Sequence, residues 1–258
     1  VLVGGIKRIG EVTEFMVPVM SVIYIAACLA VIVVNITRVP AVFGMIFQGA
    51  FSPAAVTGGA AGVGVKMCIT WGVKRGVFSN EAGLGSAPIA HAATSETNPV
   101  KQGLYGIFEV FMDTIVICTL SGLTLLLALD GSTLNYGVEG TTSLNALALG
   151  TVFGNKAGAL IIAIGLSLFA LSTVLSWGLY GTRCWEYLLG EKAVKPYQII
   201  FTLVVIISAT MDLSLAWAIA DTLNGLMAIP NLIGLLLLCP VVFKMTREYF
   251  DSERRLRK

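Results

Sequence analysis

The sequence has few charged residues and a single histidine. Only 12% of its 258 residues are charged, about half the share of a typical soluble domain, whereas 56% are hydrophobic. His91 alone cannot build a histidine-based metal cluster, and the five cysteines show no CxxC spacing. P-loop, GxSxG and HExxH motifs are also missing from the sequence. These features argue against an enzyme, a metal centre, an organic cofactor and a disulfide framework.

The sequence as a whole is apolar: its mean hydropathy is +0.86, and its charges are confined to the gaps between long apolar runs. This pattern predicts an all-α, polytopic membrane protein surrounded by lipid. The small net charge of +2 is not clustered as nucleic-acid binding would require. Lys7 and Arg8 precede the first run, so the positive-inside rule predicts that this end is cytoplasmic. We expect a single membrane domain over 1–258.

The apolar runs predict six or seven membrane helices. The first, 16–36, has about the 20 residues that a membrane helix needs, with Pro18 in its first turn. Residues 39–51 predict an amphipathic helix on the outer surface, or alternatively a half-span. Further spans are expected at 104–129, 157–180, 197–211, 213–227 and 230–243, an external loop at 130–156, and a basic tail at 244–258. If both ends are cytoplasmic, the number of crossings is even, which favours six, with 213–243 as one long, broken helix instead of two spans; the alternative is seven spans with an external tail.

Residues 52–99 combine a glycine-rich apolar segment with a polar run. Gly58, Gly59, Gly62 and Gly64 lie close together, although each costs a helix interior about 1 kcal/mol relative to alanine. One interpretation is an interrupted helix that lines a binding site, and the other is close helix–helix packing. The span is expected to end on the cytoplasmic side at Lys74, before a polar loop.

The segment GVKRGVFSNEAGLGSAP at 72–88, called here the signature segment, resembles the motif of the sodium:alanine (alanine/glycine:cation) symporter family. The apolar runs around it are similar to that family in order and spacing, so the resemblance covers essentially the whole chain. It implies the C-terminal portion of a transporter of the plasma membrane, preceded by about four helices, with a partial leucine-transporter-type inverted-repeat fold. It also implies symport of alanine or glycine with Na⁺ by alternating access.

Two stretches are candidates for the substrate site. An unwound backbone at Thr57, Gly58 and Gly59 would offer N–H groups to a carboxylate and carbonyls to an ammonium. In the apolar run at 168–181, Thr173 and Trp177 are one helical turn apart. Their side chains also fit a hydroxyl bonded to its own backbone and a packed indole. The resemblance implies that Thr173 and Trp177 contact the amino acid.

Ion binding and gating are assigned to other polar residues. Ser172 and Thr173 are candidate Na⁺ ligands, because Na⁺ prefers hydroxyl and carbonyl oxygens. By resemblance, the signature segment contributes inner-mouth gating residues: Arg75, Ser79, Asn80 and Glu81. We expect Arg75 to pair with Glu81, an ion pair that contributes little to stability where it is solvated.

Carboxylates within the apolar runs require partners, because an isolated charge in a membrane is costly. Glu109 and Asp113 are four residues apart and lie on one helix face. Asp113 fits an ion or proton relay, or a structural bond to Arg75, Lys74 or loop backbone, and we favour the structural bond. Asp221, Thr222 and Asn224 are polar within a later run and receive no further assignment.

Two other classes of protein compete with the symporter. An ion channel or pore-forming subunit would also explain glycines and a carboxylate within the membrane, but it predicts a repeated selectivity loop that the sequence lacks. An integral-membrane enzyme would require histidines or paired carboxylates, and one loop histidine argues against it. Saturable, Na⁺-dependent uptake would distinguish the symporter from both.

Overall fold

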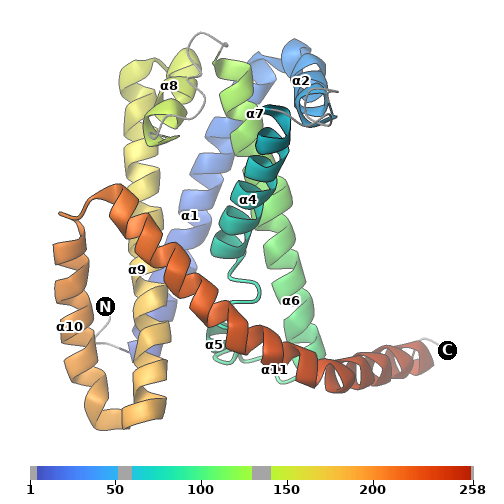
Figure 1. The fold of residues 1–258 in the computed structure, drawn as a ribbon, viewed down its shortest axis with the longest axis vertical. Coiled ribbons are helices and arrows are strands. Elements are labelled where there is room, and N and C mark those ends of the chain that lie inside the picture. Colours follow the sequence, from blue (N-terminus) through green and yellow to red (C-terminus); the bar gives the residue numbers. More distant parts are fainter. Residues whose placement is uncertain (1–4, 52–59, 130–140, 257–258) are drawn as a thin grey trace. The chain divides into compact units, whose positions relative to one another are not determined.

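The computed structural model describes residues 5–51, 60–129 and 141–256, and every regular element in these ranges is helical (Figure 1). The chain forms two compact units, each built from two stretches of sequence. The first unit contains Val1–Trp71 and Thr114–Thr182, and the second contains Gly72–Asp113 and Arg183–Lys258. The all-α prediction is confirmed for these residues.

Within the described ranges, four helices are long and apolar enough to cross a membrane: Arg8–Val34, Pro99–Ala128, Asn155–Leu189 and Leu213–Ser252. The predicted count of six or seven is therefore not reproduced by length and composition. Of the two alternatives for 213–243, two spans or one long helix, the structure shows one helix, α11 (Leu213–Leu256). Pro230 and Pro240 lie inside it, and each proline removes only one backbone hydrogen bond from a leucine-rich helix.

In the first unit, α1 (Gly5–Val34) packs against α7 (Cys118–Ala128) and α8 (Thr141–Phe153). One buried cluster joins Ala27 and Val31 of α1 to Leu149 and Ile162. The helix begins earlier than expected, so Pro18 lies in its interior rather than in its first turn. The expected span at 104–129 begins at Pro99, and it is α-helical as α6 (Pro99–Phe111), π-helical as η3 (Met112–Ile117) and α-helical again as α7.

A 3₁₀ turn, η2 (Ile36–Arg38), connects α1 to α2 (Val39–Phe51), so a helix is present where an amphipathic one was predicted. Arg38 donates from Nη1 to the carbonyl of Leu127 at 2.9 Å, which ties the turn to the end of α7. Val42 of α2 is buried with Leu127 and their neighbours, whereas Phe47, on the predicted apolar face, is exposed. An exposed apolar face on a short helix suits contact with lipid.

The helices α8 and α9 (Asn155–Leu189) meet at a tight corner. Gly154 adopts a φ of +84° between them, a conformation that glycine tolerates best. A Cβ added to Gly158 would lie 2.5 Å from the backbone nitrogen of Gly150, so the two backbones are in direct contact. Of the external loop expected at 130–156, residues 141–153 are helical, and 130–140 lie outside the described residues.

The second unit contains the end of α4 (Ala60–Asn80), the short helix α5 (Ala87–His91), α6, the end of α9, α10 (Val194–Ser208) and α11. Asn98 caps α6 by accepting hydrogen bonds from the backbone of Val100 and Lys101, as expected of a residue before a first-turn proline. Asp212 caps α11, and hydrogen bonds from Ser214 and Leu215 lower the pKa of its carboxyl.

The interrupted helix predicted at 52–99 is described only from Ala60 onward. The backbone is helical through Gly62 and Gly64, so these two glycines do not break it, while Thr57, Gly58 and Gly59 lie outside the described residues. The helix also continues past the predicted end at Lys74 to Asn80. The polar residues after it form turns and α5, which confirms the predicted short helix and loop.

Candidate functional site

The signature segment ends α4 and forms a tight loop on one side of α11. Gly83 and Gly85 adopt φ values of +89° and +87°, where residues with a Cβ are strained. A Cβ on Gly85 would lie 3.0 Å from Oδ1 of Asn231, so this glycine also allows the loop to approach α11 closely. The glycines of the motif therefore have a local structural cause: they fix the loop and its contact with α11.

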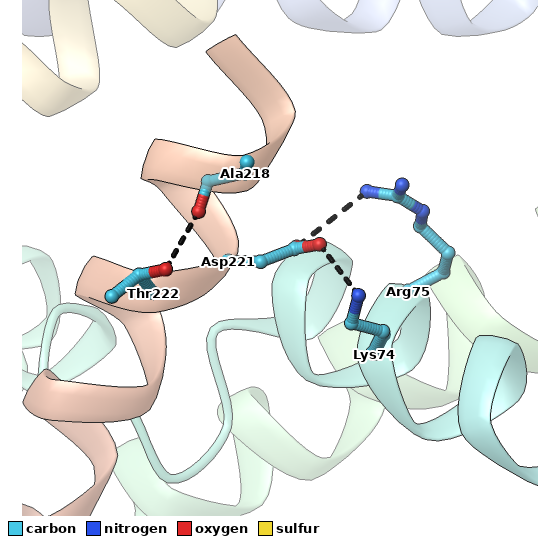
Figure 2. Close-up of polar contacts among 5 residues, drawn as sticks. All are labelled: Lys74, Arg75, Ala218, Asp221 and Thr222. Carbon is cyan, nitrogen blue, oxygen red and sulfur yellow. Dashed lines mark hydrogen bonds and ion pairs between the residues drawn. The ribbon is translucent and has the colours of Figure 1, made fainter. Parts of the chain in front are cut away.

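One carboxylate on α11 faces two cations of the signature segment (Figure 2). Asp221 Oδ2 lies 2.9 Å from Lys74 Nζ, and Oδ1 lies 3.8 Å from Arg75 Nη1. The Arg75 guanidinium is also stacked over the Trp217 ring, 3.8 Å from its centroid. Phe78 contacts the same indole edge-to-face, with the centroids 5.2 Å apart. We call Lys74, Arg75, Trp217 and Asp221 the Asp221 cluster.

The charges of this cluster favour a direct contact between Asp221 and the two cations of the signature segment. The Asp221 side chain is only 20% exposed, so its charge is partly removed from water and needs a partner. Lys74 and Arg75 supply that partner, and the face of the Trp217 indole attracts the Arg75 guanidinium as well. The neighbouring Thr222 hydroxyl donates to the Ala218 carbonyl of its own helix and takes no part in the cluster (Figure 2).

Other polar residues of the signature segment contact η3 or their own helix. The Ser79 hydroxyl donates to Asp113 Oδ2 at 2.7 Å, so Asp113 has the structural hydrogen bond that we favoured, but with Ser79. Asn80 donates to the carbonyl of Gly76 at 2.9 Å. Arg75, expected beside Glu81, has its guanidinium against Trp217 and Asp221, while Glu81 adopts a φ of +52° at the end of α4.

The second group of predicted residues lies in the first unit, on α9. Ser172 and Thr173 both donate to the carbonyl of Phe169, at 2.8 and 2.9 Å, as hydroxyls in membrane helices commonly do. These bonds use the hydroxyl hydrogens and leave oxygen lone pairs on both side chains. Thr173 is exposed, and Trp177 is half-buried in edge-to-face contact with Tyr180.

A cavity of about 280 Å³ lies in the first unit beside the same helix. Its walls are mainly apolar, and its polar groups are Asn145 and the hydroxyl pair of Tyr24 and Ser121, whose oxygens are 2.6 Å apart. Phe169 contributes to the wall and contacts the Tyr24 ring edge-to-face at 6.2 Å. Phe169 lies one helical turn before Thr173, but neither Thr173 nor Trp177 is among the residues that line the cavity.

The sequence did not predict the roles of Asp221 and of the cavity. Asp221 was recognised as polar within an apolar run, but its partners are far away in the chain. The sequence does contain a signal that would have suggested this pairing. One apolar segment contains a carboxylate, and another ends in two consecutive cations, a lysine and an arginine. Tyr24, Ser121 and Asn145 carry no comparable signal, because each is common in a membrane helix or loop.

Four helices that are long and apolar enough to cross a membrane, together with the match to a family of transporters, indicate a multi-pass membrane protein of the transporter class. The chain belongs to the sodium:alanine symporter family, whose model matches residues 1–258. This confirms the family resemblance of the signature segment.

Curated relatives match nearly the whole chain. A protein of Methanococcus maripaludis named sodium/alanine symporter AgcS is 49% identical over 98% of this chain and 55% of its own length. An uncharacterized transporter of Haemophilus influenzae is 44% identical over 97% of this chain and 54% of its own. A Bacillus subtilis protein named probable sodium/glutamine symporter GlnT is 36% identical over 98% and 52%. The chain thus spans about half the length of these relatives.

Proposed function

We propose that this chain is part of a secondary transporter that couples the uptake of a small neutral amino acid, alanine or glycine, to Na⁺. The observation that carries the proposal is the match of the family to all 258 residues, together with 49% identity to a relative named for sodium and alanine. A relative named for glutamine belongs to the same group, so substrate size has to be decided by the residues of the pocket.

Thr173 and Trp177 are our candidates for contact with the amino acid. They lie one turn apart on α9, and Phe169, one turn before the exposed Thr173, contributes to the cavity wall. An indole beside the substrate would narrow the pocket and favour a methyl group or hydrogen over a longer side chain. On the sequence argument, Thr57, Gly58 and Gly59 would supply backbone groups to the carboxylate and ammonium.

Na⁺ binding is assigned to Ser172 and Thr173. Their hydroxyl hydrogens point to the Phe169 carbonyl, which leaves lone pairs that suit a hard cation. Transport would then proceed by alternating access, in which Na⁺ and substrate bind before one part of the protein moves against another. The Asp221 cluster would hold the signature segment against α11 in one of these states and release it in the other.

The test is uptake of labelled alanine by the complete protein in proteoliposomes, with and without a Na⁺ gradient. We expect gradient-driven, saturable accumulation, and a loss of most of it in Trp177→Ala, because the change removes the proposed pocket wall. Trp185→Ala is the matched control: it lies on the same helix and stacks on Tyr197, with the ring centroids 5.5 Å apart, in the second unit.

Three outcomes can be distinguished. Uptake lost in Trp177→Ala but kept in Trp185→Ala supports both the transporter and the pocket. Uptake unaffected by either change would remove Trp177 from the site. If folded wild-type protein accumulates neither alanine nor glycine in response to Na⁺, the proposed substrate or coupling ion is wrong.

A further inference from the structure

Beyond the transport site, the end of α11 has a surface for which the proposed function gives no role. The helix changes character after Phe243: residues 213–243 are mainly apolar, whereas Lys244 begins a charged stretch that stays helical to Leu256. At 1.5 Å per residue the apolar part alone is about 46 Å long. The apolar part is therefore long enough to cross the ~30 Å hydrocarbon core of a bilayer, and the charged turns follow directly on it.

The basic side chains of these turns gather on one face. At 100° per residue they fall within a sector of about 100°, and all of them are exposed; we call this set the basic stripe: Lys244, Arg247, Arg254 and Arg255. Phe243 and Phe250 border the stripe and are 71% and 43% exposed. Cations beside exposed aromatic rings are a composition typical of helices at the headgroup region.

A different face of the same turns borders α6 within the second unit. Met245, Glu248, Tyr249 and Ser252 line a shallow groove of about 260 Å³ together with residues 98–100, at the start of α6. At 100° per residue the basic stripe lies on another side of these turns, which form the red end of α11 in Figure 1.

Two acidic residues accompany the stripe but neutralise it only weakly. Lys244 and Glu248 are 3.9 Å apart, and so are Arg247 and Asp251, which is at the limit of an ion pair. All four side chains are at least half exposed, and pairs of this kind contribute little. Four cations and two carboxylates leave the face with net positive charge, and the cations remain available to an external anion.

We propose that the basic stripe binds the headgroups of anionic phospholipids. Its charge complements theirs, and it continues a membrane helix, so it lies at the height where phosphate groups are found. The bordering Phe243 and Phe250 suit the adjacent acyl region. A soluble polyanion would also complement the positive charge, but it would not bind the exposed aromatic rings next to a membrane span.

The experiment measures lipid retention by the complete, detergent-purified protein using native mass spectrometry. Phosphatidylglycerol and phosphatidylcholine are added in equal amounts, at low and at high salt. We expect preferential retention of phosphatidylglycerol that falls with salt, and a loss of most of that preference when the four residues of the stripe are changed to glutamine, since each cation near an anionic surface contributes to the attraction.

Two further variants provide controls that act through charge. Glu248→Gln with Asp251→Asn keeps the helix but removes the carboxylates, so the preference for phosphatidylglycerol should rise. Lys192→Gln with Lys195→Gln removes two exposed lysines, one just before α10 and one in its first turn, and should leave the preference nearly unchanged.

Several results would overturn the proposal. Equal retention of the two lipids by the wild type would exclude a charge-selective site. An unchanged preference after neutralisation of the stripe, in protein with wild-type melting temperature, would place the lipid elsewhere. Displacement of phosphatidylglycerol by inorganic phosphate at matched ionic strength, with no such effect of chloride, would identify a phosphate site instead of a lipid site.

Discussion

Asp221 connects two segments of the second unit with a single side chain. Its carboxylate faces both Lys74 and Arg75, so changing it to asparagine removes the charge while keeping the size. We expect Asp221→Asn to reduce Na⁺-driven uptake about tenfold, since couplings between sites are typically 1–3 kcal/mol. Without the carboxylate, two adjacent cations repel each other and the signature segment loses its contact with α11. Initial rates of uptake at equal protein amounts measure the effect.

Thr222→Val is the matched control for this change. Its hydroxyl bonds only within α11, to the Ala218 carbonyl, so valine should leave uptake close to that of the wild type. An uptake in Asp221→Asn equal to that in Thr222→Val would show that the Asp221 cluster has no part in transport.

Single residues were predictable from the sequence where their roles are local. Asn98 before Pro99 marks a helix start by its own chemistry, and the structure shows the cap. Asp113 illustrates the limit: the need for a partner follows from its apolar surroundings, but Ser79 was not distinguishable from Lys74 or Arg75 as that partner. Pairing depends on how helices are packed, which one segment of sequence does not encode.

The corner between α8 and α9 gives a prediction for an element. Gly158→Ala would force a Cβ to within 2.5 Å of the Gly150 nitrogen and 2.8 Å of the Ala146 carbonyl oxygen. Because backbone atoms cannot move aside cheaply, we expect a loss of about 1–3 kcal/mol in stability, seen as a lower melting temperature of the complete protein in detergent.

Gly165→Ala tests the same substitution on the same helix without the clash. No heavy atom lies within 4 Å of the added Cβ, so the melting temperature should stay the same or rise slightly, because alanine favours helix. An equal loss in both variants would mean that helix propensity or another general effect, and not the contact with α8, explains the result.

Hydropathy located most helices but misjudged their ends and continuity. The prediction at 157–180, with its extension towards 189, agrees with α9 because a long apolar run with few breaks has one plausible structure. At 213–243 the sequence AIPN left two alternatives open, two spans or one long, broken helix, and the structure has one helix. A proline costs a helix about 3 kcal/mol, and the loss of one turn's packing and hydrogen bonds in an apolar segment is larger, so the helix continues.

At the scale of the whole molecule, the proposed coupling predicts reciprocal stabilisation by Na⁺ and alanine. A ligand that binds only the folded protein raises its stability, and two coupled ligands raise each other's affinity by the same factor. We expect alanine to increase the melting temperature of the complete protein in Na⁺ but not in K⁺ or choline at equal ionic strength. Thr173→Val should weaken this effect, whereas Thr202→Val on α10 should not.

The result can contradict the coupling independently of the transport assay. If alanine stabilises the protein equally in Na⁺ and in choline, substrate binding does not depend on Na⁺. Stabilisation by Na⁺ alone, without any further effect of alanine or glycine, would keep the ion site and reject the proposed substrates.

The class of the molecule followed from its composition, and the family followed from the signature segment, which the match over residues 1–258 confirms. The number of crossings did not follow, because it depends on where long helices enter and leave the bilayer. A hydropathy average does not locate these entry and exit points. The charges at 244–258 indicate on which side of the membrane the tail lies, but they do not give the number of crossings.

The two prolines of α11 have a mechanical consequence. Proline has no N–H group, so the carbonyls of Leu226 and Leu236 lack the hydrogen bond that an ordinary residue would donate four positions later. Ten residues, about 15 Å along the axis, separate these weak points. A force on either end of the helix would bend it at these two places more readily than elsewhere, so α11 consists of three stiff segments joined by two flexible points. The Asp221 cluster lies on the first segment and the basic stripe on the last.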